Sequence, residues 1–147
     1  MSSEPKRMRL RGLHHVTAIC ADLERTTTFY RDVLGLHLVE EGVNDDDPGT
    51  RHFWFGDPEG TPGTLVSFLE YPDLGEARTG AGATHHFAFA VDSAEEQEAW
   101  VGYLRERDVA CTDVFRRGRF SSVYFRDPDG HIVEIATRGP GFSGDAP

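Results

Sequence analysis

The sequence predicts an α+β fold in which two tandem βαβββ modules form a curved, half-barrel-like mixed sheet around a metal cleft. The main observation is an internal repeat, because residues 13–16 (Leu-His-His-Val) are matched 71 positions later by residues 84–87 (Thr-His-His-Phe). A second pair of segments, 55–60 and 125–130, shares an Asp-Pro-acid-Gly turn at a spacing of 70. One four-stranded sheet with a single helix cannot close a core alone, so we expect the modules to pair.

The first module begins with a strand in which alternation places His15 on the opposite face from His14. We therefore expect His14 and its repeat partner His85 to have structural roles. Asp22 is suited to cap the helix that follows, and Gly35 to end it. The elements expected in order are a strand at 12–20, a helix at 23–34, a strand at 36–41, a loop at 42–49, and strands at about 50–56 and 63–70.

The second module repeats this order after a linker rich in Gly and polar residues. Ser93 and Glu96 form a capping-box pattern at the start of its helix, which is expected to bury Trp100, Val101 and Leu104. Its strands are expected at 84–91 and near 109–115, 120–126 and 131–137. The chain is interpreted as one domain over residues 1–147, with module one at about 10–71, a linker at 72–82, module two at about 83–138 and a flexible tail at 139–147.

The composition limits the classes of partner. Fifteen Lys and Arg residues against 25 Asp and Glu residues give a formal net charge of −10, which disfavours nucleic acid. No apolar run approaches the length of a membrane span, and the polar N-terminus is unlike a signal peptide. Cys20 and Cys111 lack the spacing of a zinc site and are expected to be reduced thiols. We expect a soluble, cytoplasmic protein without a membrane partner.

Three residues are candidate metal ligands: His15, His86 and Glu134. A strand histidine taken alone is more commonly a hydrogen-bonded structural imidazole, but these two occupy equivalent repeat positions. Glu134 lies between apolar neighbours in the last strand, where a buried carboxylate needs a partner. The first module has a hydroxyl there instead, from Ser67 or Thr64. Two imidazoles and one carboxylate on one face of a divalent ion leave coordination positions open.

Aromatic and basic residues supply further candidates. Tyr124 takes in module two the place of Trp54 in module one, and its phenol could donate to a substrate oxygen, with a simple aromatic lining as the alternative. His52 shares a strand face with Trp54 and is a candidate acid or base. Arg119 enters a strand and is a candidate guide for an anion, with surface solvation as the favoured alternative.

Several motifs of this sequence are shared with a known family. They are His15-Val16 followed by Asp22, then Phe29-Tyr30-Arg31-Asp32-Val33-Leu34-Gly35-Leu36, and Asp127-Pro128-Asp129-Gly130 with Glu134. In these motifs the chain resembles, over roughly residues 10–138, the vicinal oxygen chelate superfamily of glyoxalases, bleomycin-resistance proteins and extradiol dioxygenases. Within it the chain looks like the ring-cleaving dioxygenases that act on hydroquinones, through His52, Pro62-Gly63-Thr64, His85-His86-Phe87-Ala88-Phe89, Ser122-Val123-Tyr124-Phe125-Arg126 and Pro140-Gly141-Phe142.

The resemblance implies a divalent metal on His15, His86 and Glu134, with Fe(II) preferred and Mn(II), Zn(II) or Ni(II) as alternatives. It implies an extradiol-type dioxygenase that opens a hydroquinone or catechol-like ring with O₂. It also implies a homodimer, because two-module chains of the family commonly dimerise, and in some members the metal ligands come from two subunits. Tyr124 and His52 would then handle protons.

The substrate is expected to contact Trp54, Ser67 and Arg119. Two features depart from the family pattern. The extradiol signature has a histidine where this chain has Phe115-Arg116-Arg117, and hydroquinone-type members are usually about twice as long. Two alternatives therefore stay open. One is a glyoxalase-type lyase or isomerase, or a thiol transferase, that uses a metal-stabilised enediolate or oxyanion. The other is a non-catalytic drug-binding resistance module.

Overall fold

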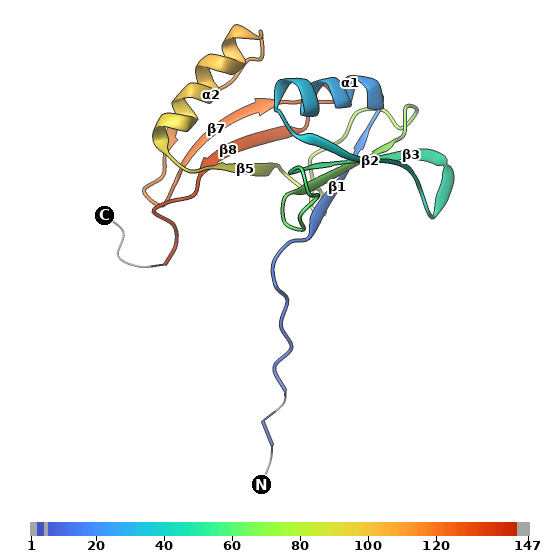
Figure 1. Ribbon diagram of the computed structural model, residues 1–147, viewed down its shortest axis with the longest axis horizontal. Coiled ribbons are helices and arrows are strands. Elements are labelled where there is room, and N and C mark those ends of the chain that lie inside the picture. Colours follow the sequence, from blue (N-terminus) through green and yellow to red (C-terminus); the bar gives the residue numbers. More distant parts are fainter. Residues whose placement is uncertain (1–2, 5, 144–147) are drawn as a thin grey trace.

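The computed structural model describes residues 3–4 and 6–143, which contain two four-stranded sheets lying side by side (Figure 1). The first sheet has the order β1 (His15–Cys20), β4 (Leu65–Glu70), β3 (Asp47–Gly56), β2 (His37–Asn44). The second has the order β5 (Phe87–Val91), β8 (Ile132–Thr137), β7 (Ser121–Arg126), β6 (Phe115–Arg116). Strands β1 and β4 pair in parallel in the first sheet, and β5 and β8 do so in the second. All other strand pairs are antiparallel. The predicted α+β class with two βαβββ modules is confirmed.

The helix of the first module changes geometry halfway along. The segment α1 (Leu23–Thr27) is α-helical and continues as the π-helix η1 (Thr28–Val33). The Asp22 carboxylate accepts hydrogen bonds from the N–H groups of Glu24 at 2.9 Å and Arg25 at 3.2 Å, which confirms the predicted N-cap. Gly35 ends the helix with φ +78°, a conformation that favours glycine.

The helix of the second module, α2 (Ala94–Glu106), has a cap that differs from the predicted capping box. The Ser93 hydroxyl accepts the N–H of Glu96 at 3.1 Å, as expected. The Glu96 carboxylate, however, accepts the N–H of Asp92 at 3.0 Å instead of that of Ser93. Val101 is buried, whereas Trp100 is only half-buried because it lies at the edge of the groove between the modules.

The predicted loop at 42–49 is wrong, because most of it belongs to a β-hairpin. Strand β2 continues to Asn44 and β3 begins at Asp47. The Asn44 side-chain oxygen accepts the N–H of Asp46 at 3.2 Å, which forms a compact turn between them. Polar turn residues are easily taken for a longer loop when the strands that they join face solvent.

The predicted strand near 109–115 is also wrong. This segment has only an isolated bridge between Cys111 and Phe125 and the two-residue strand β6. The Thr112 hydroxyl accepts the N–H of Tyr124 at 3.0 Å. In a regular strand pair a backbone carbonyl would accept this N–H. A side chain thus replaces part of the backbone pairing.

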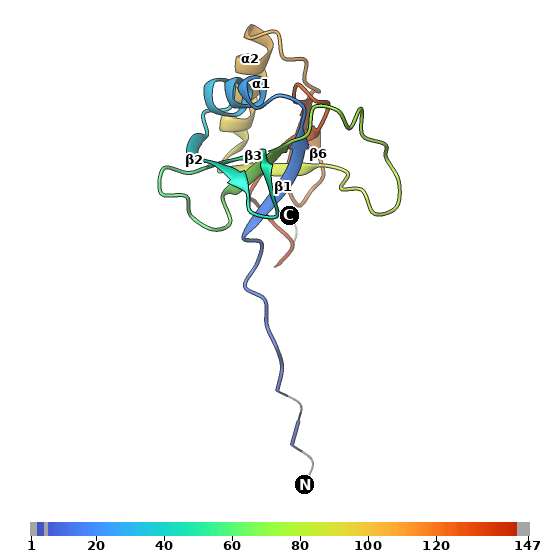
Figure 2. The same ribbon diagram turned by 90° about the vertical axis from the view of Figure 1, so that its right-hand side faces the viewer.

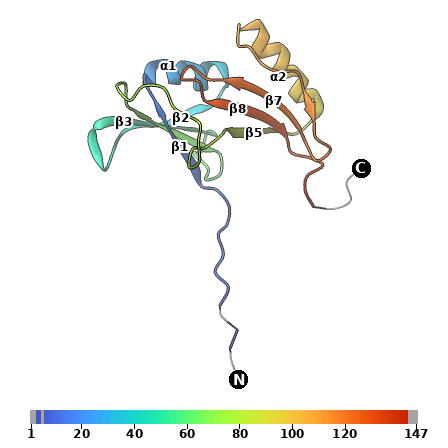
Figure 3. The same cartoon turned by 180° about the vertical axis from the view of Figure 1, so that it is seen from behind.

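The two modules share one hydrophobic core. Tyr30 is fully buried, and its ring lies 4.7 Å from that of Phe68, while Phe29 reaches across to Phe125 at 6.1 Å. The Tyr30 hydroxyl donates to the Asp127 carboxylate in the turn between β7 and β8 at 2.8 Å. Helix η1 is therefore fixed against the second sheet, as Figure 3 shows from behind.

The described N-terminal segment lies outside this core. Residues 6–12 form no helix or strand and extend away from the sheets (Figure 2). The predicted tail at 139–147 falls partly outside the described residues, since these end at 143. Among the described residues no helix combines the length and the apolar character that crossing a membrane requires.

Candidate metal centre

Two of the three candidate ligands lie next to each other in the second module. Glu134 stands on β8 opposite Ala88 of β5, and His86 lies immediately before β5. The His86 Nε2 atom is 2.9 Å from Glu134 Oε1. The Glu134 side chain is only 5% exposed, and no Arg or Lys among the described residues forms an ion pair with it. A buried carboxylate that faces one imidazole and makes no direct ion pair with Arg or Lys is suited to a divalent metal ion.

The other carboxylate oxygen of Glu134 is held by a residue that the sequence did not single out. The buried Ser122 hydroxyl donates to Glu134 Oε2 at 2.8 Å. Arg117 donates through Nε to Ser122 Oγ at 2.9 Å and through NH2 to the Tyr124 hydroxyl at 2.9 Å. Alternation along β7 could have identified Ser122, because residues 122 and 124 share a face. Arg117 lies outside a regular strand and has no such signal.

The first module presents a second group of polar residues. His52 Nε2 lies 2.8 Å from Ser67 Oγ, and the Thr17 hydroxyl lies 2.7 Å from the same oxygen. The ring of Trp54 lies 4.7 Å from that of His15 and 4.9 Å from that of His52. Partial burial, and then the neighbouring His15, lower the pKa of His52, which favours a neutral imidazole at pH 7. A neutral imidazole can accept a proton, as an acid/base residue must.

Strand register shows which positions of the two modules correspond. Ser67 pairs with Thr17 on β1, as Glu134 pairs with Ala88 on β5. The hydroxyl at the position of Glu134 is therefore Ser67. Thr64 instead belongs to the turn before β4, where its hydroxyl donates to the Thr61 carbonyl at 2.7 Å.

The same register relates the aromatic residues. Trp54 pairs with Ser67 in the first sheet, and Tyr124 pairs with Glu134 in the second. Trp54 and Tyr124 thus occupy equivalent positions in the two sheets, as predicted. The ring of Tyr124 lies 5.6 Å from that of His86 in an edge-on orientation.

Each candidate histidine ligand is contacted by the histidine before it. The Nδ1 atoms of His14 and His15 are 2.9 Å apart, and those of His85 and His86 are also 2.9 Å apart. A contact that occupies Nδ1 leaves Nε2 as the nitrogen available to a metal. His14 and His85 therefore contact the candidate ligands, which agrees with the structural roles expected for them.

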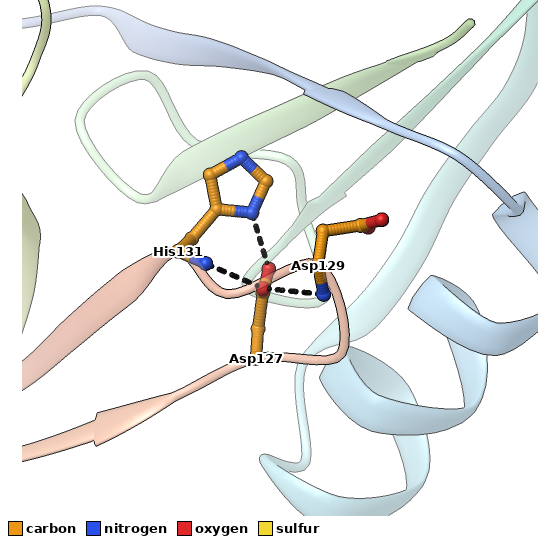
Figure 4. Close-up of side chains that lie close together, drawn as sticks. All are labelled: Asp127, Asp129 and His131. Atoms are coloured by element: carbon orange, nitrogen blue, oxygen red, sulfur yellow. Dashed lines mark hydrogen bonds and ion pairs between the residues drawn. The ribbon is translucent and has the colours of Figure 1, made fainter. Parts of the chain in front are cut away.

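The ligand atoms of the three candidates do not all come within 4.8 Å of one another in the single chain, although His15 and His86 line the same groove. Within residues 3–4 and 6–143, two groups of three His, Cys, Asp or Glu residues have ligand atoms within 4.8 Å of one another, and neither contains His15, His86 or Glu134. One group is Asp127, Asp129 and His131 (Figure 4), and the other is Asp22, Glu24 and Glu70.

Both groups are explained by structural hydrogen bonds. Asp127 accepts from Tyr30 at 2.8 Å. It also lies 2.7 Å from His131 Nδ1 (Figure 4). The side chain of Arg51 joins Glu24 and Glu70, at 2.8 Å to each. The contact between Tyr30 and Asp127 holds the two modules together, and the contacts of Arg51 secure the start of α1.

Arg119 stands apart from the candidate ligands. Its guanidinium lies 5.1 Å from the centroid of the Phe142 ring, and its carbonyl accepts the N–H of Gly141 at 2.7 Å. Among the described residues its side chain makes no hydrogen bond to Tyr124 or Glu134. Its contacts thus connect the loop before β7 to the C-terminal segment.

Comparisons with known proteins agree with this architecture. The protein named "Putative ring-cleaving dioxygenase MhqO" from Bacillus subtilis (strain 168) is 37% identical over 130 residues, which are 88% of this chain and 41% of that protein. The chain also superposes, with a TM-score of 0.80, on a crystal structure titled "putative dioxygenase" from Bacillus subtilis. The two are 36% identical, and the match covers 87% of this chain and 41% of that one. The chain thus spans about two fifths of the length of these relatives.

A shorter relative carries a different activity in its name. The metallothiol transferase FosB of Staphylococcus epidermidis is 27% identical over 130 residues, covering 87% of this chain and 84% of that protein. The family model described as Glyoxalase/Bleomycin resistance protein/Dioxygenase superfamily matches residues 12–135. The chain therefore belongs to the glyoxalase, bleomycin-resistance protein and dioxygenase superfamily.

Proposed function

We propose that this protein is a metal-dependent ring-cleaving dioxygenase that acts on a hydroquinone or catechol-like aromatic. The observation that carries the proposal is the buried Glu134 carboxylate facing His86 at 2.9 Å, with Tyr124 beside it on β7. The names of the relatives at 36–37% identity support the reaction class. A site with a carboxylate, an imidazole and a phenol combines metal binding with a proton donor.

The metal would be held by His15, His86 and Glu134. Fe(II) is the ion we favour, with Mn(II), Zn(II) or Ni(II) accepted by the same donor set. A bound Fe(II) supplies Lewis acidity and a redox route between an electron-rich ring and O₂. The buried setting of Glu134 keeps water from competing for its carboxylate.

The remaining residues of the cleft would bind the ring and move protons. Trp54 offers an aromatic wall beside His15, and Ser67 a hydroxyl within reach of His52. His52 would accept a proton from a ring hydroxyl, and Tyr124 would donate one to an oxygen of the substrate. Arg119 would act at the rim, where it could guide an anionic substituent.

We infer a homodimer in which His15 of one copy faces His86 and Glu134 of the other. The inference rests on the three ligand atoms, which do not all lie within 4.8 Å of one another in one chain. Two copies related by a twofold axis would form two equivalent sites. A cytoplasmic location fits the two free cysteines, Cys20 and Cys111.

The test of the reaction is oxygen uptake by protein loaded anaerobically with Fe(II). A panel of hydroquinones and catechols would be supplied, and ring-opened product followed by absorbance. Uptake matched by product in the wild type, and lost in Glu134→Gln, is the expected result. Protein that retains iron but consumes no oxygen with any member of the panel would rule the reaction out.

A thiol transferase is the second candidate, because the match to FosB covers 84% of that relative. That chemistry consumes a thiol and an electrophile without O₂, so anaerobic thiol loss in the presence of Mn(II) would identify it. An enediolate-forming lyase of this family would have a carboxylate in each module. The first module instead has Ser67 at the position equivalent to Glu134, which argues against this alternative. Binding of a planar aromatic without metal or turnover would instead identify a drug-binding module.

A further inference from the structure

We propose that Arg117 is a positioning residue that orients the Tyr124 phenol and, through Ser122, the Glu134 carboxylate. The proposal rests on the function proposed above and extends it to a residue outside the strands. Arg117 lies directly after β6, and its backbone N–H donates to the Phe120 carbonyl at 3.0 Å. Gly118 follows with φ +81°, so the chain turns back sharply and presents the guanidinium to β7.

The directions of the hydrogen bonds follow from the chemistry of the groups. A guanidinium has donors and no acceptor, so Ser122 Oγ and the Tyr124 oxygen must both accept from Arg117. A carboxylate only accepts, so the Ser122 hydrogen points to Glu134 Oε2. The relay therefore runs in one direction, from Arg117 to Ser122 to Glu134.

The relay fixes which oxygen of Glu134 is available. Oε2 is occupied by Ser122 at 2.8 Å, whereas Oε1 lies beside His86 Nε2 at 2.9 Å. Glu134 would thus direct Oε1 toward the site where an ion would contact both Glu134 and His86. A carboxylate held in this way does not have to lose rotational freedom when it binds an ion, so its affinity is higher.

The same guanidinium sets the phenol of Tyr124. Because the oxygen accepts from Arg117 at 2.9 Å, the Tyr124 hydrogen is free to point toward another acceptor, such as a substrate oxygen. The guanidinium carbon lies 5.7 Å from the centroid of the Tyr124 ring, which limits how far the ring can swing. One arginine therefore fixes a proton donor and a candidate metal ligand together.

Arginine is suited to this role and lysine is not. A guanidinium offers two donors in a rigid planar arrangement, while an ammonium group is a single point on a flexible chain. The corresponding place in the first module has no such relay, because His52 contacts Ser67 directly at 2.8 Å. The relay is thus confined to the module that carries the carboxylate.

The test compares Arg117→Gln with the matched control Arg116→Gln in the full-length protein. Arg116 is the exposed neighbouring residue, and its side chain makes no hydrogen bond among the described residues. Mn(II) is the probe, and its dissociation constant would be measured by competition with a chromophoric chelator. We expect Arg117→Gln to weaken Mn(II) binding about 10-fold or more, as losses of contacts to metal ligands do. Arg116→Gln should bind Mn(II) as the wild type does.

A double-mutant cycle identifies the route. Ser122→Ala should weaken Mn(II) binding to a similar degree, and Arg117→Gln with Ser122→Ala should lose less than the product of the two single losses. Arg117→Lys should recover only part of the affinity. At saturating Fe(II), Arg117→Gln and Tyr124→Phe should each lower kcat more than they raise KM, because the phenol acts after the substrate is bound.

Four outcomes would overturn the proposal. Unchanged Mn(II) affinity in folded Arg117→Gln, or full multiplication of the Arg117 and Ser122 effects, would show that the relay does not act on Glu134. If Arg117→Gln fails to fold, wild-type affinity in Arg117→Lys would have the same meaning. A wild-type protein that binds no Mn(II) would overturn the metal centre as well, and so distinguishes that failure from the failure of the relay.

Discussion

Ser67 and Glu134 occupy equivalent positions in the two sheets. Ser67 pairs with Thr17, two residues after His15, and Glu134 pairs with Ala88, two residues after His86. The two modules therefore differ at one decisive point. Glu134 can hold a cation, whereas Ser67 can only donate or accept a hydrogen bond. The duplicated scaffold is therefore asymmetric at this position, with a carboxylate in one module and a hydroxyl in the other.

Replacement of Glu134 by Gln should abolish metal retention. The amide keeps the size of the side chain but loses the charge that a divalent ion requires. We expect Mn(II) affinity to fall by more than the roughly 10–100-fold that contacts to ligands contribute. The metal content after gel filtration would be measured, with the exposed Glu98→Gln as control. Full metal content in Glu134→Gln would remove this residue from the site.

Mixing two defective variants should restore activity if the site is shared between copies. His15→Ala and Glu134→Gln each destroy both sites of their own homodimer. A mixed dimer has one intact site, so random exchange should restore roughly one quarter of the sites. Oxygen uptake or Mn(II) binding would be followed after brief mild denaturation and refolding of the mixture. Activity that stays at the level of the separate variants would mean that each site lies within one chain.

Replacement of Tyr30 by Phe should destabilise the protein by about 1–3 kcal/mol, because a buried carboxylate loses one of its hydrogen-bond donors. The acceptor is the Asp127 carboxylate, whose side chain is fully buried. Urea unfolding followed by fluorescence would give the change in free energy. Tyr71→Phe is the control, since its hydroxyl contact with Asp47 at 3.2 Å is exposed to solvent. Equal stabilities of Tyr30→Phe and Tyr71→Phe would contradict the importance of this contact.

The free energy of unfolding should contain a pH-dependent part from His131. The hydrogen bond to Asp127 raises the pKa of His131 above its ordinary value of 6.5. A raised pKa in the folded state means that the stabilisation is complete below pH 6.5 and is lost as the pH rises through the folded-state pKa. The difference in free energy between the wild type and His131→Gln should therefore shrink from pH 6.5 upward. A difference that grows over this range would reverse the assignment.

The sequence was informative where repetition or alternation constrains a residue. The spacing of 71 residues predicted the equivalence of His15 and His86, and alternation placed Tyr124 in the position of Trp54. It could not predict whether His15 meets His86 and Glu134 within one chain. The relative placement of the modules depends on how η1 packs on the second sheet, and such packing leaves no periodic pattern in the sequence.

Arg117 shows a second limit. In the sequence it belongs to a short basic run that is typical of solvent-exposed surface. Its role depends on the turn at Gly118, which brings the guanidinium onto β7. Local backbone geometry of this kind becomes visible only when the strand that it contacts is also placed.

The bonds between the modules determine what can be separated. Tyr30 donates to Asp127, and Asp129 accepts from both the Ala21 amide at 3.2 Å and Arg25 at 2.7 Å. Either repeat expressed alone would leave a buried carboxylate or a large aromatic face exposed to water. The two repeats have therefore lost their independence, and a protein engineer who wishes to graft this cleft onto another scaffold must transfer the pair as one inseparable unit.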